Sequence, residues 1–408
     1  MARYSALRRR SQVIGMIAVT GMLAVVSDAA AAINPTCRVV NQTQGSHLPP
    51  DSGQSLAAAI SAATAGDELT VIGSCTGTYT LDKDLTLTGL STKRFPLPTL
   101  DGGHAGSTLT VNSGVTATVT NLVITGGTGH VDPGVPFGDG GGILNGGTLT
   151  LVRVSVSGNV SQGSGGGIWN VGTVIVQGFS VVSRNGANRG GGIFNGNTGT
   201  VIVRESSILS GNGADFGGGI ENFGTFTIDA SSVTGNNAQF QGSGIHNGGT
   251  ITLRSSTVSN NTVTFDGAGI YNEGGTVTLE SSTVSGNMGS GAGGGLHNSA
   301  GSRAGVVTVN MSTISQNMSG YGGGIYNNNS NATLTVNASF VRGNTAYVNG
   351  GGIYNDAGTA NIQNSSAVTG NTALVSGGGI YNNTGLVAVA SSVVSGNTPD
   401  DCVGVAGC

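Results

Sequence analysis

One position in this chain recurs ten times with side chains that could bind a ligand or do chemistry. It lies between an apolar residue, usually isoleucine, and an asparagine, and eight of its ten occupants carry a ring, although the chain is only 5% aromatic. Rings repeated at strand spacing could stack on the apolar faces of sugars, or simply on one another, at about 0.2 to 1 kcal/mol per pair. The residues alone leave both readings open. The occupants are Leu144, Trp169, Phe194, Glu221, His246, Tyr271, His297, Tyr326, Tyr354 and Tyr381.

Ionisable side chains offer few candidates for catalysis. Glu221 and His246 occupy neighbouring copies of that position, and a surface hydrogen bond explains this pair as well as acid and base chemistry does. Asp139, Asp215 and Asp266 precede three glycine pairs, but never in adjacent copies. Asp215 and Asp266 would lie about 10 Å apart, the outer limit for an inverting glycosidase pair. We therefore expect no catalytic residues, metal site or cofactor, with a carbohydrate-active enzyme as the alternative.

These positions belong to a repeat whose clearest copy reads Gly-Gly-Gly-Ile-Tyr-Asn at 377–382, and copies follow every 25 to 29 residues. A period of that length indicates a solenoid. The unit 267–287 contains three segments that alternate apolar and polar residues, which predicts three short strands per coil with the apolar face inside. The asparagines that close the copies are Asn145, Asn170, Asn195, Asn222, Asn247, Asn272, Asn298, Asn327, Asn355 and Asn382.

A second asparagine series runs through the same repeats, three residues after an apolar residue in each copy. Asparagine tolerates left-handed backbone, and its amide can bond the same amide one coil away, so we predict two stacked columns. The distance from a second-series asparagine to the following first-series asparagine is 10 or 11 residues. The distance from a first-series asparagine to the following second-series asparagine varies from 14 to 19 residues. Insertions therefore collect on one edge, chiefly at 299–305 and 328–332. The second series is Asn159, Asn185, Asn212, Asn236, Asn261, Asn287, Asn317, Asn344, Asn371 and Asn397.

The Gly-Gly-Ile-x-Asn element, together with an apolar-x-x-Asn element such as 394–397, resembles the polymorphic outer membrane protein repeat family. The resemblance covers roughly residues 138–397, with Val, Leu or Ile where the family has phenylalanine. It implies a right-handed parallel β-helix that is secreted from, or exposed on, a bacterial cell, with adhesion as the usual role.

Composition narrows the class of protein and of partner. Charged residues make up 8% of the chain, against roughly 25% in an average protein, which suits a secreted protein with a Ser, Thr, Asn and Gly surface. Net charge is −4, and residues 1–32 hold four arginines and one aspartate, so the remainder carries −7. A weakly acidic chain without a cluster of basic residues argues against nucleic acid or an anionic membrane surface as partner.

The ends of the chain predict an export signal and a capped solenoid. Residues 1–32 have a basic start, an apolar run and a small-residue cleavage site, the pattern of a signal peptide, and we expect no membrane span in the mature chain. Residues 33–67 then form a cap with a helix over 55–65 that covers the open end of the core, and 68–137 form irregular first coils. We expect strands at 69–72, 85–88, 109–111 and 119–125, then ten regular repeats over 138–397, for about 13 coils in all.

Four cysteines in an exported chain imply disulfides. Of the three possible pairings, sequence neighbourhood favours Cys37 with Cys75 and Cys402 with Cys408, the latter in a tail over 398–408. Both bonds would pin the ends of the solenoid, where strand edges are exposed.

The middle strand of several copies carries a Thr-x-Thr pair. A flat threonine lattice on a β-helix resembles the face of ice-binding proteins, but threonine is also the default residue of a solvated strand. Val306, Leu386 and Ala388 interrupt the lattice. The pairs are Thr148 and Thr150, Thr225 and Thr227, Thr250 and Thr252, Thr276 and Thr278, and Thr333 and Thr335.

Together these patterns predict an all-β, right-handed parallel β-helix with a short N-terminal capping helix. We expect a secreted or surface-exposed, adhesin-like binding protein that recognises glycans or other cell-surface molecules without catalysis. The aromatic column or the variable edge would carry the binding.

Overall fold

A computed structural model describes residues 37–44, 46–47, 54–93, 96–129 and 139–408. All of them belong to one compact unit, Pro35–Cys408. The expected signal peptide at 1–32 lies outside the described residues. Among the residues that are described, no helix has the length and apolar character needed to cross a bilayer.

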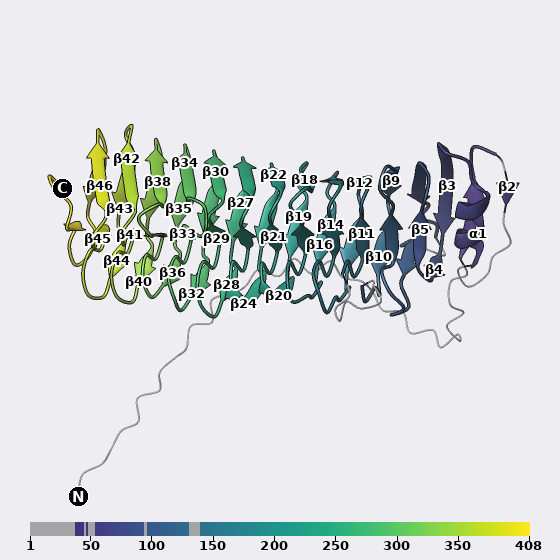
Figure 1. Ribbon diagram of the computed structural model, residues 1–408, viewed down its shortest axis with the longest axis horizontal. Helices are drawn as coiled ribbons and strands as arrows, with labels where there is room; N and C mark the ends of the chain where they lie inside the picture. Colours follow the sequence, from purple (N-terminus) through teal and green to yellow (C-terminus); the bar gives the residue numbers. More distant parts are fainter. Residues whose placement is uncertain (1–36, 45, 48–53, 94–95, 130–138) are drawn as a thin grey trace, which may run out of the picture. The chain divides into compact units, whose positions relative to one another are not determined.

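The described residues confirm an all-β, right-handed parallel β-helix (Figure 1). Each regular coil contributes one strand to each of three long sheets, which we number 1 to 3. The next coil follows the same path beside it. Sheets 2 and 3 hold 13 strands each, which correspond to about 12 turns from the first strand to the last. Pairing is parallel throughout, except that β1 runs antiparallel to both β2 and β3.

Sheet 1 has 15 strands. In spatial order they are β2 (Ser46–His47), β1 (Arg38–Asn41), β3 (Asp67–Ile72), β6 (Leu85–Gly89), β9 (Thr116–Thr120), β12 (Thr148–Val152), β15 (Thr173–Gln177), β18 (Thr200–Val203), β22 (Thr225–Asp229), β26 (Thr250–Arg254), β30 (Thr276–Glu280), β34 (Val306–Asn310), β38 (Thr333–Asn337), β42 (Thr359–Gln363) and β46 (Leu386–Ala390).

Sheet 2 follows sheet 1 in every coil. Its strands are β4 (Ser74–Thr76), β7 (Thr99–Asp101), β10 (Val123–Thr125), β13 (Ser155–Ser157), β16 (Val181–Ser183), β19 (Ile208–Ser210), β23 (Ser232–Thr234), β27 (Thr257–Ser259), β31 (Thr283–Ser285), β35 (Thr313–Ser315), β39 (Phe340–Arg342), β43 (Ala367–Thr369) and β47 (Val393–Ser395).

Sheet 3 contains the Ile-x-Asn elements. Its strands are β5 (Tyr79–Leu81), β8 (Leu109–Val111), β11 (Ile143–Asn145), β14 (Ile168–Asn170), β17 (Ile193–Asn195), β21 (Ile220–Asn222), β25 (Ile245–Asn247), β29 (Ile270–Glu273), β33 (Leu296–Ser299), β37 (Ile325–Asn328), β41 (Ile353–Asn355), β45 (Ile380–Asn382) and β48 (Cys402–Val403).

Alternation along each strand places the apolar residues in one core inside the three sheets. In the coil of β29 to β31, the side chains of Ile270, Val277, Leu279 and Val284 have no exposed surface, as the pattern predicts. A fully buried aliphatic side chain contributes about 1.5 to 3 kcal/mol, so four per coil make this core the main source of stability.

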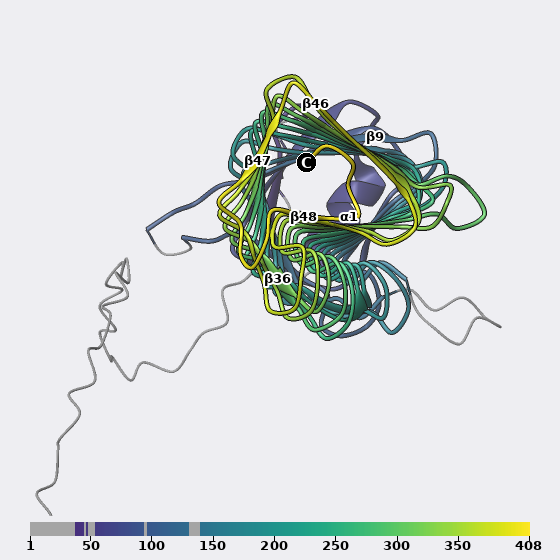
Figure 2. The ribbon, with the colours of Figure 1, turned by 90° about the vertical axis from the view of Figure 1, so that its left-hand side faces the viewer.

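A fourth sheet, which the sequence did not predict, runs beside sheet 3. Figure 2 shows the three long sheets around the core in end view, with β36 in a second, smaller loop on the outer side of the sheet that holds β48. We call the seven segments that form this loop, residues 211–219, 235–244, 260–269, 286–295, 316–324, 343–352 and 370–379, the lobe. The strands of sheet 4 are β20 (Gly213–Phe216), β24 (Asn237–Gln241), β28 (Thr262–Val263), β32 (Met288–Gly289), β36 (Met318–Ser319), β40 (Thr345–Ala346) and β44 (Thr372–Ala373).

The capping helix exists but is shifted from the predicted 55–65. Helix α1 spans Gln54–Ala62 and buries Leu56, Ala59 and Ile60 against the first coils. It ends early because the Thr64 amide donates to Asp67 Oδ2 at 2.9 Å instead of continuing the helix. Lys83 Nζ donates to the Ile60 carbonyl at 3.2 Å, which satisfies one of the free carbonyls at the helix end.

The early coils correct one strand prediction. The expected strand over 119–125 is two strands, β9 and β10, which belong to different sheets. Asn121, with a φ of 54°, makes the corner between them. Left-handed geometry at asparagine costs little, so the chain can turn there.

Both predicted asparagine columns are present. Asn272 Nδ2 donates to Asn298 Oδ1 at 2.9 Å, and the two residues are direct partners in sheet 3. In the second column, Asn261 Nδ2 donates to Asn287 Oδ1 at 2.9 Å and to the Val233 carbonyl at 3.2 Å. The column ends where Asn397 Nδ2 donates to Asp401 Oδ1. These amides satisfy backbone groups that the corners remove from water.

A third polar column, of serines, lies at the corner between sheets 1 and 2. From Ser207 to Ser366 the amide of each serine donates to the hydroxyl oxygen one coil on, as from Ser282 to Ser312 at 3.0 Å, and the Val154 amide donates to the Ser180 hydroxyl oxygen. The residue before each of these serines is left-handed, for example Ser281 with a φ of 50°. The hydroxyl also donates within the corner, as from Ser282 to the Glu280 carbonyl at 2.9 Å. Members of the column are Ser180, Ser207, Ser231, Ser256, Ser282, Ser312, Ser339, Ser366 and Ser392.

The favoured cysteine pairing is confirmed. Cys37 bonds Cys75 in the first coils, and Cys402 bonds Cys408 beyond β48. The first disulfide closes a loop of 38 residues that contains α1, so it restricts the unfolded chain in the region that covers the core end.

We predict that Asn272→Leu destabilises the fold by roughly 3 kcal/mol or more. The substitution removes the donor to Asn298 and to the Gly275 carbonyl, and the acceptor for Asn247. Urea unfolding followed by circular dichroism measures the loss. Asn331→Ala, in the exposed insertion loop, is the control. Equal, small effects of both substitutions would contradict a stabilising role for the column.

Candidate functional site

The recurrent ring position forms one column along sheet 3. Register pairs Trp169 with Phe194, and then Glu221 with His246, coil by coil. Ring centroids lie 5.4 Å apart between His246 and Tyr271. In the last three coils the tyrosine rings stack at 5.0 Å, from Tyr326 to Tyr354 and from Tyr354 to Tyr381.

The column does not form an open platform along its whole length, because the lobe covers part of it. His246, Tyr271, His297 and Tyr354 are buried. Trp169, Phe194, Tyr326 and Tyr381 are half-buried. Burial raises the pKa of Tyr271 and of Tyr354 to about 12. The rings therefore pack mainly against each other and the lobe, and a ligand could reach only the half-buried ones.

The repeated glycines explain how the lobe closes over this column. Gly267 has a φ of 64°, and a Cβ there would lie 2.7 Å from the Tyr271 Cβ. A Cβ on Gly269 would lie 2.4 Å from the Gly295 carbonyl oxygen of the next coil. Any larger side chain would thus push the chain off the ring column or off the neighbouring coil.

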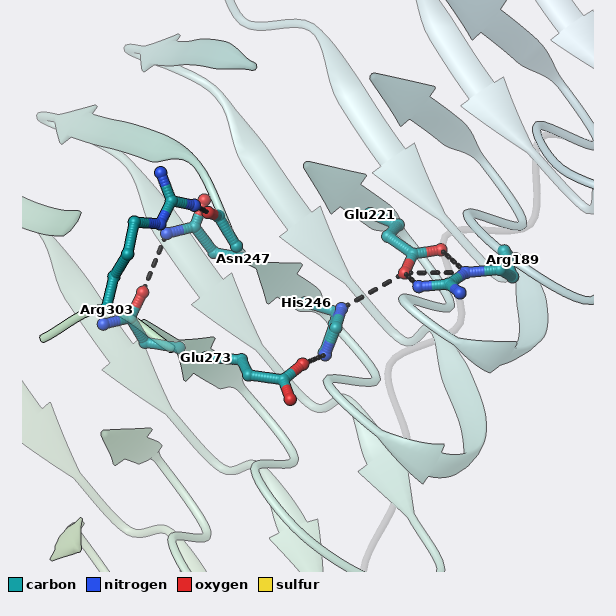
Figure 3. A network of polar contacts seen from close by, with 8 residues as sticks. Arg189, Glu221, His246, Asn247, Glu273 and Arg303 are labelled. Atoms are coloured by element: carbon teal, nitrogen blue, oxygen red, sulfur yellow. Dashed lines mark hydrogen bonds and ion pairs between the residues drawn. The ribbon is translucent and has the colours of Figure 1, made fainter. Parts of the chain in front are cut away.

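Four ionisable residues meet where the ring column changes to charged side chains (Figure 3). Arg189 pairs with both oxygens of Glu221 through Nε at 3.0 Å, and its Nη2 also contacts Oε1. His246 Nδ1 lies 3.3 Å from Glu221 Oε1, and its Nε2 lies 3.4 Å from Glu273 Oε2. Glu221 has no exposed surface, whereas Glu273 is 52% exposed. The expected pair of Glu221 and His246 is therefore part of a chain of alternating charge.

The charges set the protonation states of this cluster. Burial has the largest single influence on His246 and lowers its pKa, but the carboxylates of Glu221 and Glu273 together outweigh it and raise the pKa above that of an ordinary histidine. Hydrogen bonding to Glu221 raises the pKa of Arg189, and hydrogen bonding to His246 lowers the pKa of Glu273. The two carboxylates thus favour the protonated form of His246.

Access decides what this cluster can do. Glu221 is enclosed, with both oxygens taken by Arg189 and one also facing His246. The Arg189 guanidinium also lies over the Phe216 and Phe223 rings at 5.6 and 5.4 Å. A carboxylate without exposed surface cannot reach a polysaccharide, so the cluster acts as a charge-balanced part of the lobe interior. The charges of the cluster lie on neighbouring coils, but they do not line the open groove that an enzyme acting on a polysaccharide needs.

The variable edge folds back over the same region. The Arg303 guanidinium donates to the Gly248 carbonyl (Figure 3), 55 residues earlier in the chain and two coils away. This contact comes from the 299–305 insertion, where the repeat lengthens. The insertion is therefore anchored to the solenoid.

His297 is buried without charge compensation. Its ring lies 4.7 Å from Tyr271 and 4.8 Å from Tyr326, and neither nitrogen forms a well-aligned hydrogen bond with the described residues. Burial lowers the pKa of His297 to about 4 and outweighs the opposing influence of Asp266 and the Ala292 backbone. His297 is therefore neutral at neutral pH.

The aspartates before the glycine pairs have backbone partners. Asp139 Oδ1 accepts the Ser164 amide at 2.7 Å, and Asp266 Oδ1 accepts the Ala292 amide at 2.7 Å. Each bond joins one coil to the next, and the bond to Asp266 lies within the lobe. Across the described residues, His, Cys, Asp and Glu side chains form no cluster that could hold a metal ion.

One set of exposed apolar side chains lies on the lobe, where the sequence analysis placed no strand. Each of six consecutive coils exposes at least one large apolar side chain there, and we call the six residues named below the outer row. The rings of Phe240 and Phe265 stack with their centroids 5.8 Å apart and 18° between their planes. The Phe240 ring also contacts the Phe216 ring of the preceding coil, at 5.3 Å between centroids. The outer row is Phe240, Phe265, Met288, Tyr321, Tyr347 and Leu374.

A sequence signal for the outer row existed. The steps of 10 or 11 residues after the second asparagine are constant in length, and apolar residues recur in them at three or four positions past that asparagine. A constant length indicates a segment with a fixed structure. The sheet 4 strand within each segment is only two to five residues long, which is too short to show a periodic pattern of apolar residues.

In comparisons with known proteins, no family model, no curated protein and no solved structure matches the chain.

We predict that Glu221→Gln destabilises the protein by roughly 3 kcal/mol, because Arg189 and His246 lose a buried counter-charge. The pKa of His246 should fall as well. Chemical denaturation and NMR titration of the imidazole measure the two effects. Glu280→Gln is the matched control, since its ion pair with Arg254 is exposed and should contribute no more than about 1 kcal/mol. Similar losses from both variants would contradict the structural role of the cluster.

We also predict an acid sensitivity that depends on His297. Its folded pKa of about 4 lies below the unfolded value, so the neutral ring stabilises the fold fully above about pH 6.5. That contribution falls as the pH drops toward about 4, by on the order of 3 kcal/mol in total. His297→Phe should flatten the fall in unfolding free energy between about pH 8 and about pH 4.5, whereas His104→Asn, at an exposed histidine, should not. Identical pH profiles for His297→Phe and the parent protein would show that the ring is not buried in the neutral form.

Proposed function

We propose that the chain is a secreted or surface-exposed, adhesin-like β-helix that binds glycans or other cell-surface molecules without catalysis. The outer row is the observation that carries the proposal. Six exposed apolar side chains on successive coils, four of them aromatic, form the kind of patch that marks an interaction site. Phe240 and Met288 lie in strands of sheet 4, and the other four lie in the lobe segments that continue from those strands.

The chemistry of the outer row suits a carbohydrate better than a wholly apolar partner. Phe265 and Tyr347 expose about half of their surface, so ring edges and faces are open to the C–H groups of a sugar. Polar side chains flank the rings: Gln239 is exposed, and Gln241 and Asn349 are half-buried. Aromatic contacts with amides at their edge are the usual lining of a ligand site that must fix a polar molecule.

The export pattern at 1–32 and the resemblance to polymorphic outer membrane protein repeats support the same function. Both favour a bacterial protein at the cell surface or outside the cell, and disulfides occur mainly in such oxidising compartments. The resemblance rests on the two repeated elements and not on a wider match.

A carbohydrate-active enzyme is the second candidate, and the cluster of Arg189, Glu221, His246 and Glu273 is the observation that favours it. Its burial argues against that function. An enzyme of this kind would release reducing ends or unsaturated products from a polysaccharide, and Glu221→Gln would abolish the release.

We predict that the purified mature protein binds a defined set of structures on a glycan array. Phe265→Ser and Tyr347→Ser should each weaken binding by about tenfold or more, equivalent to about 1.4 kcal/mol of lost contact, at nearly unchanged melting temperature. Tyr354→Ser, in the buried ring column, should lower the melting temperature instead. Absence of glycan and cell binding by the folded protein, or binding that survives both outer-row substitutions, would overturn the proposal.

A further inference from the structure

Two columns of threonine side chains cover the outward face of sheet 1. Strand register places Thr225 against Thr250 and Thr250 against Thr276, and in parallel Thr227 against Thr252 and Thr252 against Thr278. Both columns run through ten consecutive strands, from β9 to β42. The first column is Thr116, Thr148, Thr173, Thr200, Thr225, Thr250, Thr276, Val306, Thr333 and Thr359; the second is Thr118, Thr150, Ile175, Ile202, Thr227, Thr252, Thr278, Thr308, Thr335 and Asn361.

The register shows that Val306 does not break this lattice, whereas Leu386 and Ala388, which follow Thr359 and Asn361 in β46, end it. Sixteen of the 20 positions hold threonine, and three of the remaining four hold Ile175, Ile202 and Val306. Valine has the shape of threonine with a methyl in place of the hydroxyl. Nineteen of the 20 side chains are therefore β-branched and present a methyl group at the same place. All 20 are half-exposed or exposed.

Sheet 2 of the same solenoid is the internal comparison. Its ten strands from β10 to β43 also offer 20 flanking positions that point away from the core, but only six hold threonine and eight hold serine. Both sheets are parallel and cover the same core, so strand propensity favours β-branched residues on both. The sheet 2 strands hold three residues, so their outward positions adjoin corners, whereas nine of the ten sheet 1 strands hold five. The long threonine columns are found on sheet 1 and not on sheet 2. The six are Thr125, Thr234, Thr257, Thr283, Thr313 and Thr369.

The lattice has two fixed repeats. Neighbouring strands lie about 4.8 Å apart, and the two columns, two residues apart along each strand, lie about 6.7 Å apart. None of the 20 positions carries a charge; Asp229, Arg254 and Glu280 lie in the next column along the strands. A partner that matches an uncharged array in two dimensions must itself be periodic in two dimensions, and faces of hexagonal ice repeat their oxygen positions at comparable distances.

We propose that the outward face of sheet 1 binds ice. The methyl groups of the β-branched side chains leave shallow troughs in which water takes up an ordered arrangement, and the threonine hydroxyls hydrogen-bond that water. Buried asparagine and serine columns behind the face hold successive coils in register. The protein loses little conformational entropy on binding, because its backbone is already fixed. Many weak contacts along roughly 45 Å of sheet then sum to a stable attachment.

The experiment measures ice shaping and thermal hysteresis by nanolitre osmometry, and the fraction of protein taken into a growing ice hemisphere. We expect faceted crystals with the folded, full protein. Thr252→Tyr, at the centre of the face, should lower thermal hysteresis by about tenfold. Thr257→Tyr, outward on sheet 2 in the same coil, should leave it unchanged. Thr252→Val should keep more activity than Thr252→Ser, since valine retains the methyl lattice.

Circular dichroism melting verifies that each variant is folded, and Thr252→Val covers the case in which tyrosine unfolds the coil. Exclusion of the folded protein from ice overturns the proposal, as do equal losses from Thr252→Tyr and Thr257→Tyr. Retention by insoluble crystalline cellulose or chitin without ice shaping also overturns it, and would assign the lattice to a crystalline polysaccharide. The result is independent of glycan binding by the outer row, because the two surfaces share no residue.

Discussion

Each coil of this solenoid has to turn its backbone at corners that are closed to water, and the buried amide columns make this possible. A corner amide or carbonyl without a partner would cost about 1 to 3 kcal/mol, and the same corner recurs in every coil. Three such groups are satisfied around Asn261: its side chain donates to the Val233 carbonyl and accepts the Asn236 amide, and its own amide donates to Asn287 Oδ1. Because each asparagine serves the next coil as well as its own, the repeat can vary in length elsewhere but not at these positions.

The same requirement explains why charges occur inside the lobe. Between Phe194 and Tyr271 the ring column is replaced by Glu221 and His246, and both are buried. Buried charges persist only when they are paired, and here Arg189 and Glu273 complete an alternating series. The neutral His297, one coil beyond Tyr271, shows the other way to bury an imidazole. The pKa values of two histidines at equivalent positions thus shift in opposite directions, because His246 contacts two carboxylates whereas burial outweighs the influence of Asp266 on His297.

Sequence reasoning predicted the fold, the inward residues, both asparagine columns and the disulfides, because each leaves a period or a count in the sequence. It placed the ring column on an outward face but could not predict its burial, since the lobe strands are as short as two residues and carry no alternation. The serine column escaped notice because serine is common on this surface and only the left-handed residue before it, such as Ser281, distinguishes a corner. Arg189 could not be linked to Glu221, 32 residues away, because it lies in the connection between β16 and β17 and not at the repeated ring position.

The surfaces that remain free for function lie on different sides of the solenoid, as the end view shows, with sheet 1 opposite the lobe (Figure 2). They also differ in what the fold demands of them. Lobe residues must pack over the ring column, so the outer row inherits part of its apolar character from the interior beneath it. The face of sheet 1 covers only its own inward residues, and sheet 2 shows that serine, valine or arginine would meet that structural need equally well. Packing therefore does not require the sixteen threonines there, and this is why we propose a partner for the face of sheet 1.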